Sequence, residues 1–333
     1  MSVKERVLLL LEENKGEPIS GEDIAEKLGC TRASVWKAVK SLQSEGYMVE
    51  AVNNKGYTLK TSPDVLSEAF IKDKVSASGI DIEIEAKKTV DSTNNILKQL
   101  ASDGYRKSKV LIAEEQTAGK GRRGRSFYSP KNTGIYISFL LHPDVAISEA
   151  SMYTTIAATA LSKAIEKVSG FSVDIKWVND IWMRGKKVSG ILTEASTSIE
   201  DGTLEYIVVG IGINLYEPNG GFPEDIKDVA GAVFTDSTPI ENLRNNIASE
   251  LIIQFMNYYN AGIDGAEFLS DYEKRCFVIG KDVRLLTPDH ENVVNGQETV
   301  VHVLGINEKC HLHVRFADGH EEFLSGGEIS VKI

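Results

Sequence analysis

The 333-residue sequence has few cysteines, no long apolar run and no excess of positive charge. Its three cysteines, Cys30, Cys276 and Cys310, are odd in number and far apart. They argue against a disulfide framework or a cysteine zinc site, and for a reducing compartment. No stretch approaches the roughly 18 uncharged apolar residues of a membrane span, and the charged N-terminus does not resemble a signal peptide. We therefore expect a cytoplasmic protein that makes no membrane contact.

The amino-acid composition is typical of a globular protein. Hydrophobic residues make up 42% and charged residues 26% of the chain, and its length suggests two or three domains. The formal net charge of −11 does not favour binding of the molecule as a whole to nucleic acid. Any DNA contact must therefore come from a local patch.

The first 62 residues follow the pattern of a winged helix-turn-helix. Ser20 and Thr31 are placed to cap the second and third of three short helices, and two strands at 47–52 and 56–59 predict a hairpin wing. In the third helix we expect four apolar residues to face inward: Val35, Trp36, Val39 and Leu42.

Charge is segregated within this module. It contains nine Lys or Arg and nine Asp or Glu, yet the basic residues of the third helix and wing share a face: Arg32, Lys37, Lys40 and Lys55. We expect this face to meet phosphates, with Arg32, Ala33 and Ser34 near base edges. The alternative is a protein-interaction domain with a solvated basic face; the element order favours DNA binding.

The rest of the chain alternates strands and helices. Short turns such as the one at residues 184–186 join neighbouring strands, so we expect an α+β domain with a mixed sheet. Short strands after residue 276 predict a small antiparallel barrel. The expected domains are 1–62, 63–275 and 276–333. The central strands are expected at 82–86, 109–115, 134–141, 173–178, 187–194 and 204–213, and the helices at 65–75, 94–102 and 152–168.

Residues 119–125 carry three glycines and four basic side chains. They match the dinucleotide fingerprint G-x-G-x-x-G, but that fingerprint must open a helix and this segment leads into a strand. What remains is a loop whose backbone N–H groups and cations suit a phosphate with an adjacent carboxylate. A merely solvated basic loop is the alternative.

Three further clusters surround this loop, at residues 91–94, 175–180 and 187–192, and a buried-type strand ends at Asn214. Lys187, Ser189 and Ile191 alternate along one strand, so we expect them to share a face from which Lys187 points at an anion.

Taken in order, these clusters resemble the signature of the biotin protein ligases. With the preceding helix-turn-helix, the chain is similar to the bifunctional type that is also a biotin operon repressor. The motifs are Asp91-Ser92-Thr93-Asn94, the segment Gln116 to Arg125, Lys176-Trp177-Val178-Asn179-Asp180, Lys186 to Leu192, and Gly210 to Asn214. Val178 replaces a usual proline and Phe127 a common tryptophan; we expect altered loop rigidity rather than a lost site.

The resemblance implies an SH3-like C-terminal domain, formation of biotinyl-5′-AMP from biotin and Mg²⁺-bound ATP, and transfer of biotin to a carrier lysine. The implied catalytic residues are Lys187 and Arg122, and no metal is expected on protein ligands alone. For biotin it implies Ser92, Thr93, Asn94, Gln116, Lys120, Gly121, Arg122 and Lys187, with Trp177 and Ile191 as apolar walls. For ATP or the adenylate it implies Gly119, Arg122, Arg125, Asn179, Asp180 and Asn214.

The expected partners are a biotin carboxyl carrier domain, operator DNA and a second copy of the chain, because one recognition helix covers only one half-site. Two alternatives stay open: a lipoate-type protein ligase, and a regulator that senses biotin without catalysing transfer.

Overall fold

The computed structural model describes residues 1–53, 55–61, 64–197, 203–235, 240–262, 266–285, 299–327 and 329–331. They form two compact units, Met1–Asp81 with Thr238–Ser249, and Ile82–Ser237 with Glu250–Ile333. The wing residue Asn54 and the expected boundary at 62 and 63 lie outside the described residues, and the division into three domains stays a prediction. Within the described ranges, no helix has the length and apolar character needed to cross a bilayer.

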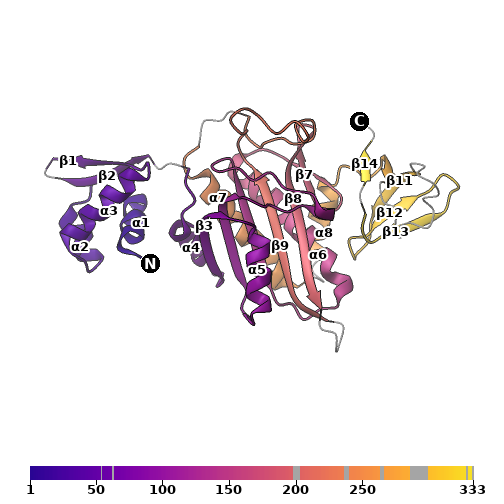
Figure 1. The fold of residues 1–333 in the computed structure, drawn as a ribbon, viewed down its shortest axis with the longest axis horizontal. Helices are drawn as coiled ribbons and strands as arrows, with labels where there is room; N and C mark the ends of the chain where they lie inside the picture. The colour runs from indigo at the N-terminus through magenta and orange to yellow at the C-terminus, as the bar shows by residue number, and fades with distance from the viewer. Residues whose placement is uncertain are drawn as a thin grey trace. The chain divides into compact units, whose positions relative to one another are not determined.

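The first unit contains the predicted helix-turn-helix and wing (Figure 1). Ser20 and Thr31 are the helix caps, as predicted: Ser20 Oγ accepts the N–H of Asp23 at 3.0 Å, and Thr31 Oγ1 accepts that of Ser34 at 3.2 Å. β1 and β2 pair antiparallel to form the wing. The elements are α1 (Val3–Glu13), α2 (Gly21–Lys27), α3 (Arg32–Ser44), β1 (Met48–Val52) and β2 (Gly56–Thr61).

One inward-facing residue of the third helix was predicted wrongly. Val35, Val39 and Leu42 are at most 1% exposed and belong to the core of the module. Trp36 is 52% exposed and does not pack against that core. At about 100° per residue, position 36 is turned away from the row of buried residues.

The remainder of the first unit joins the segment after the wing to the start of α7 (Leu243–Ala261). Asp64 and Arg244 form an ion pair of 3.4 Å in which both side chains are 2% exposed. Ser67 caps α4 (Glu68–Ala77) and donates its backbone N–H to Asn245 Oδ1 at 2.8 Å. Since Ser67 is the cap, this helix begins three residues later than predicted.

The second unit is built on a seven-stranded sheet in the order β3-β4-β5-β9-β8-β7-β6. β3 and β4 run parallel and the other neighbours antiparallel, which confirms the mixed sheet. The strands are β3 (Glu83–Val90), β4 (Lys109–Gln116), β5 (Gly134–Leu141), β6 (Asp174–Lys176), β7 (Asp180–Met183), β8 (Lys186–Thr197) and β9 (Leu204–Asn214).

The motif from Lys176 to Asp180 was expected to end a strand, and it turns a hairpin instead. Lys176 pairs with Asp180 across β6 and β7, so β6 is shorter than predicted and β7 was missed. Asn179 therefore lies in the turn that joins β6 to β7, and Asp180 is the first residue of β7.

Helices cover both faces of this sheet (Figure 1). On β5, Leu140 packs with Leu97 of α5 (Thr93–Ser102), while its neighbour Phe139 stacks on Phe255 of α7 with ring centroids 4.2 Å apart. Because adjacent strand residues point to opposite faces, α5 and α7 lie on opposite sides of the sheet. α6 (Ala150–Ser169) had been predicted, whereas α8 (Ala266–Arg275), which packs against α6, had not.

The C-terminal strands form an antiparallel five-stranded sheet in the order β13-β12-β11-β10-β14. The indole N–H of Trp177 donates to the carbonyl of Cys310 at 3.0 Å and ties the β6–β7 turn to this sheet. Closure into a barrel stays a prediction, and the last strand was not expected. The strands are β10 (Asp282–Leu285), β11 (Thr299–Ile306), β12 (Leu312–Arg315), β13 (Glu321–Leu324) and β14 (Ile329–Val331).

Candidate active site

A cavity of about 560 Å³ lies on the sheet face that carries α5. Gly119 does not line it: a Cβ there would lie 2.4 Å from the carbonyl oxygen of Phe127, so this glycine packs inside the loop. Most of the expected ligand-site residues surround this one space. They are Ser92, Thr93, Asn94, Gln116, Lys120, Gly121, Arg122, Arg125, Asn179, Asp180, Lys187 and Asn214.

The basic loop is a small hairpin of its own. Lys120 pairs with Ser126, and the N–H of Gly121 donates to the carbonyl of Arg125 at 2.7 Å. The turn passes through Arg123 and Gly124, both with positive φ. The Gly121 N–H, which we expected to face a phosphate, is therefore used within the loop.

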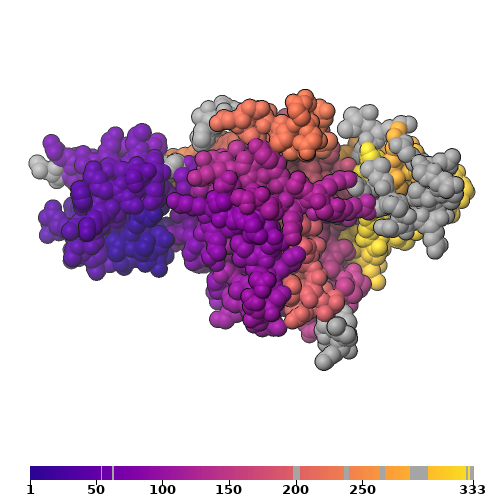
Figure 2. All heavy atoms as spheres, in the orientation of Figure 1, coloured from indigo at the N-terminus to yellow at the C-terminus, as the bar shows by residue number. Residues whose placement is uncertain are grey.

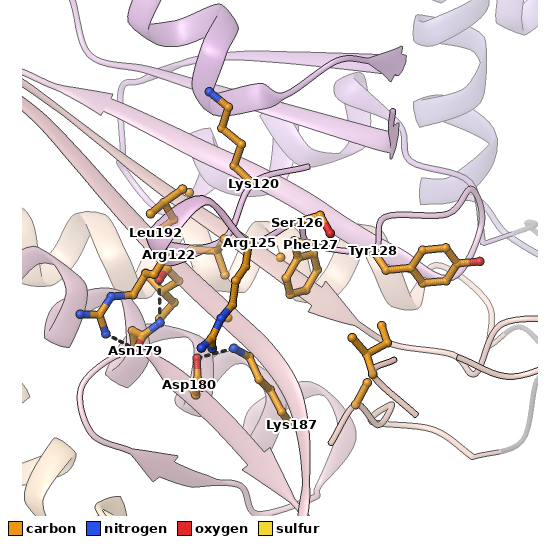
Figure 3. A pocket seen from close by; sticks show the side chains of 18 of the residues that line it. Lys120, Arg122, Arg125, Ser126, Phe127, Tyr128, Asn179, Asp180, Lys187 and Leu192 are labelled. Atoms are coloured by element: carbon orange, nitrogen blue, oxygen red, sulfur yellow. Dashed lines mark hydrogen bonds and ion pairs between the residues drawn. The ribbon is translucent and has the colours of Figure 1, made fainter. Parts of the chain in front are cut away.

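Three cations converge beside the β6–β7 turn (Figure 3). Lys187 Nζ lies 2.6 Å from Asp180 Oδ1, and Arg122 Nη1 donates to Asn179 Oδ1 at 2.9 Å. Arg125 extends to the same place (Figure 3). The cavity is lined by five basic side chains, Lys120, Arg122, Arg123, Arg125 and Lys187, and by two acidic ones, Asp180 and Asp225. This excess of positive charge suits an anionic ligand.

Lys120 points to the opposite side from these cations (Figure 3). Its charge acts on two carboxylates near α5. The pKa of Asp91 is lowered mainly by the hydrogen bond from Asn95, with a contribution from Lys120. Burial raises the pKa of Glu194, but hydrogen bonds from Lys98 and Asn94, together with the charge of Lys120, outweigh it and lower the pKa. In this conformation Lys120 is not part of the basic group.

A second wall of the cavity is neutral and polar. The backbone N–H and the hydroxyl of Thr93 both donate to Gln116 Oε1, at 2.9 and 3.1 Å. Ser138 Oγ lies 2.6 Å from both Thr93 Oγ1 and Asn94 Oδ1, and the Asn94 amide donates to Glu194 at 2.8 Å. These bonds fix uncharged donors and acceptors in place.

Glycines on the sheet make room for the side chains above it. A Cβ on Gly210 would lie 2.0 Å from Asn94 Oδ1, and one on Gly212 would lie 2.3 Å from the Phe127 ring. Gly210 and Gly212 belong to a motif that the sequence showed, but this role of theirs was not predicted. It depends on contacts with Asn94 and Phe127, which are distant in the chain.

The orientation expected for Lys187 requires correction. The β7–β8 register shifts between the pairs Ile181↔Ser189 and Trp182↔Lys187, and such a bulge interrupts the alternation of side chains. The end of the Lys187 side chain lies 3.1 Å from the position that a Cβ on Gly190 would occupy, so Lys187 lies on the same face as Gly190. The hydroxyl of Ser189 donates to the backbone carbonyl of Gly212 at 2.6 Å. Lys187 and Ser189 therefore do not share a face, although the regular alternation had predicted that they would.

Trp177 does not form a cavity wall, contrary to expectation. It is absent from the lining, and its indole N–H is bonded to the C-terminal sheet. Ile191 does line the cavity, as expected.

The sequence also missed the segment between β9 and α7. The Lys187 N–H donates to the carbonyl of Val229 at 2.8 Å, and its carbonyl accepts from Gly231 at 2.9 Å. Phe222 and Ile226 add apolar surface to the cavity. Residues 217–231 of this segment lie at the surface of the unit, among the orange atoms of Figure 2. Consecutive glycines such as those at 220 and 221 are typical of a turn and do not by themselves indicate a ligand site.

The contact of Gly212 with Phe127 yields a prediction. Gly212→Ala should push the Phe127 ring into the cavity and raise the KM for biotin, the substrate that the resemblance implies, about threefold to tenfold, with little change in kcat. Steady-state kinetics measure this. Gly305→Ala, a strand position with open space, is the control. Adding Phe127→Ala should restore the KM; a double variant as impaired as the single one would contradict the steric explanation.

Comparison with known proteins identifies the class. Residues 86–214 match the biotin/lipoate A/B protein ligase family, and residues 3–58 match an HTH domain. The bifunctional ligase/repressor BirA of Bacillus spizizenii is 36% identical over 229 residues, which is 69% of this chain and 70% of that protein. BirA of Escherichia coli is 28% identical over 280 residues, 83% of this chain and 84% of its own.

The solved structures agree. The biotin protein ligase of Aquifex aeolicus, determined in complex with biotin and ATP, superposes with a TM-score of 0.58 at 25% identity, covering 75% of this chain and 98% of that one. The chain belongs to the biotin protein ligase family, in the bifunctional type with a helix-turn-helix ahead of the ligase domain.

Proposed function

We propose that this chain is an ATP-dependent biotin protein ligase that joins biotin to a lysine of a carboxylase carrier domain. The observation that carries the proposal is a single cavity in which the cations around Asp180 are combined with the fixed neutral groups of Thr93, Asn94 and Gln116. Neutral donors and acceptors suit the ureido ring of biotin, and the cations suit its carboxylate and the α-phosphate.

The first step needs positioning and fixed positive charge. A carboxylate oxygen of biotin attacks the α-phosphorus of ATP, the bond to the β-phosphate oxygen breaks, and pyrophosphate leaves with biotinyl-5′-AMP formed. We assign Lys187 to bridge the carboxylate and the α-phosphate, and Arg122 and Arg125 to the negative charge that gathers there. Asn179, Asp180 and Asn214 are assigned to the ATP side of the cavity.

The cavity also fits the magnesium ion that accompanies ATP. Mg²⁺ is usually held by one or two carboxylates together with substrate phosphates, and Asp180 and Asp225 are carboxylates in the lining. Asp180 and Asp225 would hold the ion, which would add positive charge at the phosphates.

In the second step the amine of a carrier lysine attacks the biotinyl carbonyl. An amide bond forms, the bond to the phosphate oxygen breaks, the amine loses a proton, and AMP leaves. The partner is therefore a biotin carboxyl carrier protein or domain.

The test is purified protein incubated with ATP, magnesium, labelled biotin and a carrier domain. We expect labelled carrier and one AMP per label. Lipoate in place of biotin should not label its own carrier, which distinguishes the lipoate-type alternative. Bound adenylate without carrier labelling would contradict the ligase and leave a biotin-sensing regulator.

We further propose that the helix-turn-helix makes the protein a biotin-responsive repressor that acts as a homodimer on a two-fold operator. Specific affinity near nanomolar generally takes two recognition helices. Biotinyl-5′-AMP should be the signal, because ordering of the basic loop would couple the cavity to a neighbouring surface.

The adenylate should therefore tighten self-association and operator binding together, each by about tenfold or more. Sedimentation and DNA titration with and without the adenylate, at one salt concentration, measure this. A protein that stays monomeric with ligand, and prefers no operator over random DNA, would refute the repressor and leave the ligase unaffected.

A further inference from the structure

The recognition helix carries a large aromatic side chain that the module does not use for its own stability. Trp36 is 52% exposed, whereas the buried residues on the other side of α3 are almost fully enclosed. Trp36 also makes no part of the hydrophobic cluster of the module, neither among its buried residues nor among the partly buried ones packed against it. This half-exposed indole is therefore an apolar surface that is available to a partner.

The charge around Trp36 indicates which partner this is. Arg32, Trp36 and Lys40 are four residues apart and form one row along α3, so the indole lies between two cations. Ala33 and Lys37 form the adjacent row, and all five residues are exposed. Arg32 forms a 3.9 Å ion pair with Glu22 in which both side chains are about three-quarters exposed. From Arg32 to Lys40 this face therefore carries three basic residues, with the apolar indole of Trp36 between them.

A duplex major groove offers matching chemistry. Phosphates line its rims, and the C5-methyl group of thymine is the apolar group on its floor. Ser34, which we had expected near base edges, is half-buried with its hydroxyl 2.9 Å from that of Thr31, so it supports the cap of the helix. The centre of the exposed face is instead occupied by Trp36.

We propose that Trp36 is a specificity-determining residue for DNA, which reads a thymine methyl group in each half-site while Lys37 and Lys40 neutralise phosphates. This inference rests on the proposed DNA-binding function and assigns the residue that discriminates between sequences. Removal of the indole should therefore lower sequence preference without weakening non-specific attachment.

The test uses the full-length protein with biotin, ATP and magnesium. A duplex is first selected by the wild-type protein from a randomised two-fold library, and affinities are then measured at fixed salt for this duplex and for a random one. Trp36→Ala should bind the selected duplex about tenfold more weakly or worse, and the random duplex within about twofold of wild type. Trp36→Phe should be intermediate. Lys37→Ala is the matched control and should weaken both duplexes alike.

Substitution of thymine by deoxyuridine then removes the methyl group alone. At one position in each half-site this should cost the wild type about fourfold for each methyl group removed, and it should cost Trp36→Ala nothing. Equal losses on selected and random DNA, or sensitivity to deoxyuridine that persists in Trp36→Ala, would overturn the assignment. A change in self-association of Trp36→Ala without DNA would also overturn it, since the face would then be a protein interface. Failure of the wild type to enrich any sequence would refute DNA recognition itself.

Discussion

Lys187→Ala is expected to slow formation of biotinyl-5′-AMP by at least about a hundredfold, a loss of about 2.7 kcal/mol of transition-state stabilisation. The side chain is 29% exposed, and its ammonium is held 2.6 Å from Asp180. Its backbone is fixed by hydrogen bonds to Val229 and Gly231. Because the charge is already in place before the reaction, it can stabilise the phosphate without reorganising.

Biotin-dependent pyrophosphate release measures this effect. Lys167→Ala is the matched control, because it also removes a lysine and an ion pair, the one to Glu250, outside the cavity lining. That control should keep wild-type activity. Thermal unfolding should be nearly unchanged in both variants, since partly exposed ion pairs contribute about 1 kcal/mol or less to stability. Unchanged pyrophosphate release in Lys187→Ala would remove this lysine from the mechanism.

The helix-turn-helix could be predicted closely because its signals are local. Ser20 and Thr31 are caps that act within three residues of themselves. Trp36 was misplaced because its apolar character was taken as burial, although its position on α3 is turned away from the core. α8 was missed because charged and polar residues dominate its sequence and only a few apolar ones, such as Phe268 and Tyr272, reach the core.

The candidate site could be predicted as far as its motifs are contiguous. Five separate segments were expected to meet, and one cavity has residues from all of them in its lining. Three features could not be predicted, because they depend on contacts between distant residues. The pairing of Lys187 with Ala230 adds an unpredicted wall, the β8 bulge reorients Lys187, and Gly212 leaves space for Phe127. The roles of the individual residues stay predictions.

Arg122 should matter more for holding the adenylate than for binding biotin. Its guanidinium is anchored by Asn179 at 2.9 Å, and Asn179 is itself fixed to β8 through the carbonyl of Ile191 at 3.0 Å. The cation is thus held beside Lys187, where we place the phosphate. Arg122→Ala should speed dissociation of biotinyl-5′-AMP about tenfold to a hundredfold, the effect of about 1.5–3 kcal/mol for a hydrogen bond to a charged group. Biotin affinity should change by less than about threefold.

The released adenylate gives the prediction a second readout. A mixed carboxylic–phosphoric anhydride in solution reacts with accessible amines, so Arg122→Ala should label lysines of an unrelated protein that the wild type leaves unmodified. Retention of labelled adenylate through gel filtration measures the first effect, and labelling of the bystander protein the second. Arg106→Ala, which removes a surface arginine paired with Glu205, is the charge-loss control. Asn179→Ala keeps the charge of Arg122 but removes the side chain that anchors it, so this variant should release less adenylate than Arg122→Ala. Equal losses of biotin and adenylate binding in Arg122→Ala would mean that this arginine shapes the cavity and does not neutralise the phosphate.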